Sequence, residues 1–419
     1  MKSHKNQLLF VLLIVVTACN TKSESKGKPE IETAENIKPD TFYTIGFAGI
    51  IKHKREILIS EVAEEVEYVT LENNQNSMLG NIMDVRLTSE YIFVKHNGSR
   101  LLTQFDRKGK FIRHIGTEGR GPKEYGLMRV FSIDENKELI YIHTNWTRKI
   151  LVYNFEGDYV STIKLDGFDR LQMVWAHDSV FVSFSEPHLG TEPFVFIETN
   201  SKGDTLQTIQ NHIFWEKKGQ NSFTVSYWGR NNFYLANNKL HMKGWYNDTI
   251  YTYNEENKIV PKVLVDLKEC KIPDDLIPEK MSGKPLPKQC YWVGLNESAN
   301  FIFVRYGSHM DKTKSKEEME EGCILYNKKT KEGVAFKNKG EEYGFVNDLN
   351  GGPDFKPRYS NDSLMFVDVT AMDMKQYLDS EAFKNRETKF VEQKEKLVQF
   401  SKTLKEDGNS FLMIAKLKN

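Results

Sequence analysis

The chain has 419 residues, of which 39% are hydrophobic, 28% charged and 12% aromatic. This is enough apolar material for a folded core, which excludes wholesale disorder. Lys and Arg together number 58, as do Asp and Glu, so the formal net charge is zero. A chain without a basic excess is disfavoured as a general nucleic-acid-binding protein, and we expect no nucleic-acid partner.

The first residues predict export. Lys2, His4 and Lys5 form a basic start, and residues 8–16 are apolar throughout. Nine residues of helix span only about 13 Å, which is too short for a hydrocarbon core of about 30 Å. That length is typical of the apolar region of a signal peptide, to which we assign residues 1–18.

The end of this run, Val16-Thr17-Ala18-Cys19, resembles the lipobox of bacterial lipoproteins, although that family more often has Leu in place of Val16. The resemblance implies cleavage after Ala18 and acylation of Cys19, palmitate among the acyl chains, which anchors the protein to a membrane. No Asp follows Cys19 as an inner-membrane retention residue, so the family pattern favours the outer membrane of a cell envelope. An ordinary secretory signal with an incidental cysteine is the alternative.

Residues 19–44 are expected to form a lipidated, flexible tether. From Asn20 to about Asp40 the chain consists of Lys, Ser, Glu, Thr and Pro with almost nothing apolar, a composition that does not support a core. The folded body then covers residues 45–419.

Past residue 45, short β-branched or aromatic runs alternate with polar turns, which predicts strands in groups of four. The third and fourth strands of the first group meet at 106–109, where Gly109 supplies the positive φ of a tight hairpin. Corresponding hairpins start near residues 156, 201, 254 and 328, and the first two spacings, about 50 and 45 residues, match the repeat of a β-propeller. The predicted strands are 82–86, 91–95, 101–105, 111–115, 130–133, 139–142, 150–154, 159–164, 171–175, 179–184, 194–198, 205–209, 233–235, 240–245, 249–253, 260–266, 291–295, 301–305, 323–327 and 333–336.

A sixth repeat is predicted from both ends of the body. Residues 343–346 and 364–368 are its expected inner strands, and 411–417 is the strand that completes it. Residues 57–59 and 66–71 are expected to pair into the same blade, which closes the ring and removes an open sheet edge. Residues 372–406 contain no Gly or Pro and carry a helix-like apolar stripe. The predicted fold class is therefore all-β, a six-bladed β-propeller with a C-terminal helical insertion in the last blade, and the insertion is expected to cap the loop-rich end.

Several segments resemble the six-bladed β-propeller lipoproteins of diderm bacteria, a group related to NHL-repeat propellers. The resemblance covers nearly the whole mature chain and departs most at 291–340, through the Lys- and Glu-rich stretch 311–321. It implies the propeller fold and brings no catalytic residues. The matching segments are 105–112, 114–116, 119–125, 247–251 and 409–418.

Propellers usually bind ligands at one end of the central channel, where the connections after the second and fourth strands converge. In the connection 116–129, Arg120 is suited to a carboxylate or sulfate, or it pairs with Glu124 to tie blades one and two together. Aromatic and polar residues on the other long connections suit sugar stacking or peptide capture, but Trp also packs between blades. The ligand-binding candidates are Arg120, Glu124, Tyr125, His143, Asn145, Trp146, His188, Trp228 and Arg230.

We expect no metal and no cofactor, because the histidines are scattered and no zinc, calcium, phosphate-loop or dinucleotide motif is present. Of the cysteines after Cys19, Cys270 and Cys290 flank a Pro-rich loop and form a possible disulfide in an oxidising compartment. The alternative is that they are small buried hydrophobic residues.

The preferred hypothesis is a non-enzymatic envelope lipoprotein that binds a glycan, a peptide or a partner protein. The first alternative is a glycan-active lyase or hydrolase that uses Tyr125, His143, Arg120 and Arg230, since acid and base residues on different blades leave no spacing signal. A further alternative is a structural partner in an outer-membrane assembly.

Overall fold

The computed structural model describes residues 42–144, 149–164, 171–185, 190–214, 233–244, 247–277, 286, 289–309, 320–338 and 343–418. The predicted signal peptide, Cys19 and most of the predicted tether lie outside these residues. No helix within these ranges combines the length and the apolar character needed to cross a membrane.

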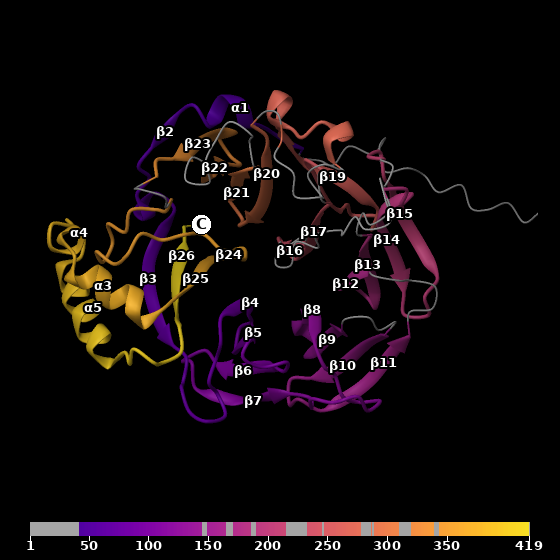
Figure 1. Ribbon diagram of the computed structural model, residues 1–419, viewed down its shortest axis with the longest axis horizontal. Coiled ribbons are helices and arrows are strands. Elements are labelled where there is room, and N and C mark those ends of the chain that lie inside the picture. Colours follow the sequence, from indigo (N-terminus) through magenta and orange to yellow (C-terminus); the bar gives the residue numbers. More distant parts are fainter. Residues whose placement is uncertain are drawn as a thin grey trace, which may run out of the picture. The chain divides into compact units, whose positions relative to one another are not determined.

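The strands form six small sheets arranged as a six-bladed β-propeller, with one strand of each sheet nearest the common axis (Figure 1). The predicted fold class is therefore confirmed. Blades one to three contain β4 (Ile82–Leu87), β5 (Tyr91–His96), β6 (Leu102–Asp106) and β7 (Phe111–Ile115); β8 (Met128–Asp134), β9 (Leu139–Thr144), β10 (Lys149–Asn154) and β11 (Tyr159–Lys164); and β12 (Leu171–His177), β13 (Val180–Ser185), β14 (Phe194–Asn200) and β15 (Thr205–Gln210). Blades four to six contain β16 (Phe233–Ala236), β17 (Lys239–Lys243), β18 (Thr249–Tyr253) and β19 (Ile259–Asp266); β20 (Tyr291–Glu297), β21 (Phe301–Ser308), β22 (Glu321–Asn327) and β23 (Glu332–Phe336); and β24 (Tyr359–Ser360), β25 (Leu364–Val369), β26 (Phe411–Leu417) and β3 (Ala63–Thr70).

The two middle strands of each blade are largely apolar on both faces because each blade packs between two others. In β5, Ile92 and Val94 belong to a core cluster shared with blade six, whereas Phe93 belongs to one shared with blade two. Burial on both faces explains why the strand-forming runs in the sequence are continuous rather than alternating.

Blade six joins the two ends of the folded body. β3 pairs antiparallel with β26, with Thr70 opposite Phe411 and Ala63 opposite Leu417. The predicted pairing of 66–71 with 411–417 is therefore confirmed, and the ring closes through backbone hydrogen bonds rather than side-chain packing alone.

Two predicted strands of this blade are wrong. Residues 57–59 and 343–346 form only isolated bridges, between Leu58 and Val346 and between Phe345 and Phe355, and the inner strand is β24 instead. Ile57, Ile59 and Phe345 have no exposed surface and belong to the core cluster between blades five and six. These residues are apolar because they fill the space between the two blades. Short apolar runs of this kind look like strands in the sequence.

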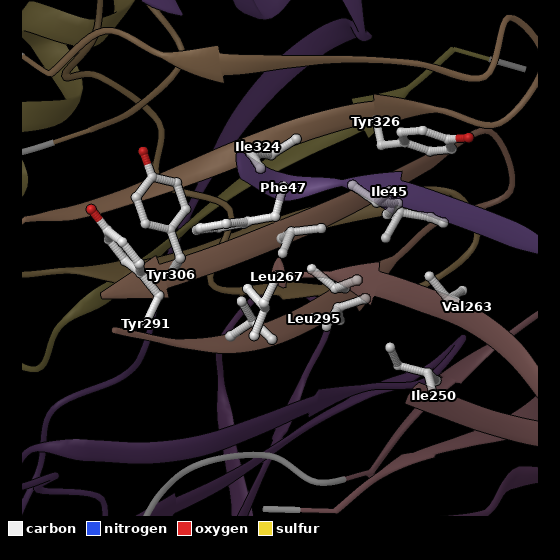
Figure 2. Close-up of a cluster of buried hydrophobic side chains, with 14 of the residues drawn as sticks. Ile45, Phe47, Ile250, Val263, Leu267, Tyr291, Leu295, Tyr306, Ile324 and Tyr326 are labelled. Carbon is white, nitrogen blue, oxygen red and sulfur yellow. The ribbon is translucent and has the colours of Figure 1, made fainter. Parts of the chain in front are cut away.

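The chain before β3 adds strands that the sequence analysis did not anticipate. β1 (Tyr43–Gly46) pairs parallel with β19, and β2 (Lys54–Arg55) pairs parallel with β23, so blades four and five each gain an outer strand. β1 begins within the last residues of the predicted tether 19–44. Between them lies the short helix α1 (Phe47–Ile50), and Figure 2 shows Ile45 and Phe47 among the buried side chains of blades four and five.

The helical insertion contains α3 (Ala371–Asp379), α4 (Glu381–Lys384) and α5 (Val391–Thr403), which confirms its predicted helical character. The expected cap over the loop-rich end is wrong, because the three helices lie on the outer side of β3, away from the axis (Figure 1). Met374 and Leu397 pack there with Phe411, and Tyr68 of β3 lies against the same cluster. The insertion buries its apolar stripe against the outer strand of blade six and leaves the axis uncovered.

Candidate functional site

Tyr125 is a core residue rather than a ligand contact. Its side chain is 2% exposed, its hydroxyl donates to the Ile115 carbonyl at 2.6 Å and accepts from the Leu102 backbone N–H at 3.0 Å. Burial raises the pKa of this phenol. Both hydrogen-bonding capacities are used within the fold, so Tyr125 fixes the connection 116–129 against blade one.

Glu124 and Arg120 lie in the same connection but are not paired with each other. An oxygen of Glu124 accepts the Gly121 N–H at 2.9 Å, and a side chain on Gly119 would collide with that carboxylate. Glu124 therefore stabilises the turn, while Arg120 is exposed to solvent. In this one loop Arg120 is exposed, Glu124 is half-buried and Tyr125 is buried.

His143 is a buried residue near the end of β9, opposite Ile150 and Val130 in the sheet. The remaining binding candidates lie outside the described residues: Asn145, Trp146, His188, Trp228 and Arg230.

The structure has Cys270, Cys290 and Cys323 as thiols, so the possible 270–290 disulfide is not formed. Cys290 is fully buried in a small apolar cluster with Ile272, and burial raises the pKa of Cys323 to about 12. A protonated, enclosed thiol is a packing residue, not a nucleophile.

The inner strands bring together charged residues that the sequence analysis did not select. At the loop end of the axis, where first strands begin and second strands end, Asp84 of β4 accepts from Arg86 at 3.2 Å. Lys95 of β5, directly opposite Asp84 in the sheet, donates to the Arg129 carbonyl of blade two at 2.6 Å. Asp84 is 8% exposed and its Oδ1 is buried with no hydrogen-bond partner.

Blade six extends this cluster from the other side. Arg358, immediately before β24, pairs with Asp368 at 2.6 Å and donates to the Ile82 carbonyl of blade one at 3.1 Å. Its guanidinium lies 5.0 Å from the centre of the Tyr359 ring. We call Asp84, Arg86, Lys95, Arg358 and Asp368 the axial polar cluster.

The axial polar cluster has the chemistry of a binding site. An unpaired buried carboxylate oxygen costs about 1–3 kcal/mol, so a donor group bound to Asp84 Oδ1 would stabilise the site. Burial lowers the pKa of Lys95 against the opposing effect of Asp84, and the two charged groups share a face of the sheet. Within the described ranges, no group of His, Cys, Asp and Glu is placed to hold a metal ion.

His96, next to Lys95, fixes the connection between β3 and β4. Its Nδ1 accepts the Gly80 N–H at 3.0 Å and its Nε2 lies 3.3 Å from the Thr103 hydroxyl. Nδ1 must be unprotonated to accept, so the ring is neutral. Burial, together with nearby His114, lowers the pKa of His96 to about 4.

This environment predicts an acid sensitivity. In the unfolded chain His96 becomes protonated below about pH 6.5, whereas in the folded protein it stays neutral down to about pH 4. The free energy of unfolding therefore falls as the pH is lowered through this range, by roughly 3 kcal/mol in all. We expect His96→Gln to lose much less stability between pH 7 and pH 4 than the wild type, measured by urea unfolding. Parallel losses in the two proteins would contradict this role of His96.

A second charged cluster lies at the opposite, turn end of the axis, between blades four and five. Glu297, with no exposed surface, lies 2.5 Å from Lys328 Nζ and 3.2 Å from His241 Nδ1, and accepts from the Tyr234 hydroxyl at 3.0 Å. Burial by itself raises the pKa of Glu297, but His241 and Lys328 hold it below its ordinary value. Because Glu297 of blade five has no exposed surface and interacts with His241 and Tyr234 of blade four, we assign these groups to holding the two blades together.

The sequence analysis selected neither charged cluster, because each of them joins residues of two different blades. The candidates came from loops, whereas the axial polar cluster sits on strand ends. The one clue in the sequence is a charged residue inside an apolar strand, as at Asp84 and Lys95. Charged residues are rarely buried unless they interact with another polar group.

One family model matches this sequence, and solved structures of other proteins have a similar fold. The model of the family described as "Domain of unknown function (DUF4934)" matches residues 42–416, and no curated protein matches the sequence. A "Putative exported protein" from Bacteroides fragilis is similar in structure, with 17% identity and a TM-score of 0.63 over 90% of this chain and 100% of that chain. A member of the DUF4221 family from Bacteroides vulgatus has 11% identity and a TM-score of 0.51 over 87% of this chain and 99% of that chain. At these identities the likeness shows the fold alone.

Proposed function

The chain belongs to the DUF4934 family, and we propose that it is a lipid-anchored envelope protein that binds a ligand without chemically converting it. The anchor is the acylated Cys19, and the folded body is a propeller lipoprotein of the NHL-related kind, in the outer membrane. The segment 16–19 supports the anchor, and the similarity to a protein described as exported accords with this location.

The ligand site in this proposal is the axial polar cluster. The observation that carries it is Asp84 Oδ1, a buried acceptor without a partner, on the innermost strand of blade one. Glycans, peptides and partner proteins all offer donors to such an oxygen. The helical insertion lies beside β3 (Figure 1), so it does not cover this end of the axis.

The test is binding of the full-length chain, purified in detergent, to arrays of glycans and peptides. We expect hits that Asp84→Asn weakens at least ten-fold, because the amide replaces one acceptor oxygen with a donor. Lys239→Met is the matched control, since Lys239, the first residue of β17, pairs with the exposed Glu255 in the turn between β18 and β19. Hits that survive Asp84→Asn, or no hits on either array, would refute the site.

The same preparations address the glycan-active alternative. Conversion of a bound glycan to a smaller product by the wild type, lost in Asp84→Asn, would replace binding with catalysis as the function.

A further inference from the structure

Asp84 and Lys95 face each other without forming an ion pair. They are opposite residues of the antiparallel strands β4 and β5, so their side chains leave the sheet on the same face. Among the described residues, Asp84 interacts by hydrogen bond only with Arg86, through Oδ2, and Lys95 only with the Arg129 carbonyl. Asp84 Oδ1 therefore accepts no hydrogen bond, and the Lys95 ammonium uses only one of its three N–H groups as a donor among the described residues.

The two groups together select a ligand group by its hydrogen bonding. A ligand carboxylate accepts from Lys95 but is repelled by Asp84, and a ligand ammonium donates to Asp84 but is repelled by Lys95. A hydroxyl does both, since it donates one hydrogen bond and accepts others. A hydroxyl placed between them satisfies the buried Oδ1 and brings no charge into the site.

Two exposed apolar residues lie close in the chain to residues of this site. Met83, next to Asp84 in β4, is 38% exposed, and Leu127, two residues before Arg129, is 49% exposed. An apolar face beside a charged pair fits a molecule with C–H groups on one side and hydroxyls at its edge. A pyranose ring has this distribution, and a peptide backbone does not.

We infer that the ligand of the axial polar cluster is a saccharide, held by a hydroxyl that donates to Asp84 Oδ1 and accepts from Lys95 Nζ. This inference rests on the proposed function and names the chemical class that the site takes. In this arrangement Met83 and Leu127 contact the C–H face of the sugar, and Arg86 orients the Asp84 carboxylate through its hydrogen bond to Oδ2.

The experiment compares one glycan hit from the array, native and with its hydroxyls O-methylated, by titration calorimetry with the full-length chain. Methylation removes the donors but keeps the ring and its ether oxygens, so we expect at least a ten-fold rise in Kd. Asp84→Asn and Lys95→Met each raise the Kd of the native glycan by ten-fold or more. Leu127→Ser, an exposed position that does not threaten folding, raises it by about three-fold or more, and Lys239→Met leaves it unchanged.

Thermal melts of each variant separate loss of binding from loss of fold, and the exposed Leu127→Ser keeps the test decisive if Asp84→Asn unfolds. Peptide hits that depend on Asp84, with no glycan hits, would overturn the saccharide assignment and leave the proposed site standing. Glycan binding unaffected by O-methylation would also overturn it. Binding indifferent to Asp84, Lys95 and Leu127 alike would remove the proposed site itself.

Discussion

Lys328→Met is expected to destabilise the protein by about 3–5 kcal/mol, because it leaves the carboxylate of Glu297 buried without its closest cation. Lys328 Nζ lies 2.5 Å from Glu297, its side chain is 8% exposed, and it also donates to the Ser298 carbonyl in the turn after β20. The measurement is the free energy of unfolding from urea denaturation at neutral pH.

The matched control is Lys239→Met, which removes an equally long cation from an exposed pair with Glu255, and its unfolding midpoint should stay close to the wild type. The double variant Glu297→Gln with Lys328→Met should recover part of the loss, because the buried charge is removed together with its partner. A Lys328→Met protein as stable as the control would show that Glu297 is not held between the blades in this way.

Gly109→Ala is expected to cost roughly 2–5 kcal/mol, the sum of a left-handed backbone penalty and a collision. Gly109 has a φ of +81°, and a Cβ there would lie 1.8 Å from the carbonyl oxygen of Thr70, the last residue of the ring-closing strand β3. Gly109 also accepts the Glu72 N–H at 2.8 Å. The substitution therefore strains the hairpin of blade one and pushes it from blade six.

Two other hairpin glycines provide the comparison. Gly203, at the same turn in blade three, has a φ of +89° and nothing within 4 Å of its would-be Cβ, while Gly157 of blade two has a φ of +84° and nearest atoms at 3.3 Å. Gly203→Ala should cost about 1–2 kcal/mol, the backbone term alone, with Gly157→Ala between the two. Equal losses at all three positions in urea denaturation would show that the contact with Thr70 carries no energy.

The three glycines show how far sequence reasoning reaches. Each turn and its positive φ follow from the local sequence, since Gly alone adopts this conformation without steric cost. The difference in expected cost between Gly109→Ala and Gly203→Ala does not follow from the local sequence. It depends on the backbone of Thr70, in a strand about 40 residues away in the chain.

The candidate site shows the same division. As an aromatic residue in a long loop, Tyr125 is a binding candidate in the sequence, whereas in the structure its hydroxyl joins two backbone groups of blade one. In the sequence Asp84 and Lys95 are parts of predicted strands, and only their pairing across β4 and β5, beside Arg129 of the next blade, makes them a candidate site.

The sequence by itself determined the repeated four-stranded units, the hairpin turns, the helical insertion and the pairing of residues 66–71 with 411–417. The units, turns and insertion follow from local composition and period, because strand-forming runs and turn residues act over a few positions. The pairing follows from the open sheet edge that an unclosed ring would leave. The tertiary structure alone decided that the N-terminal segment adds outer strands to blades four and five, that the insertion lies beside β3, and which charges meet at each end of the axis. Contacts between blades join residues far apart in the chain, so their partners leave no periodic trace in the sequence.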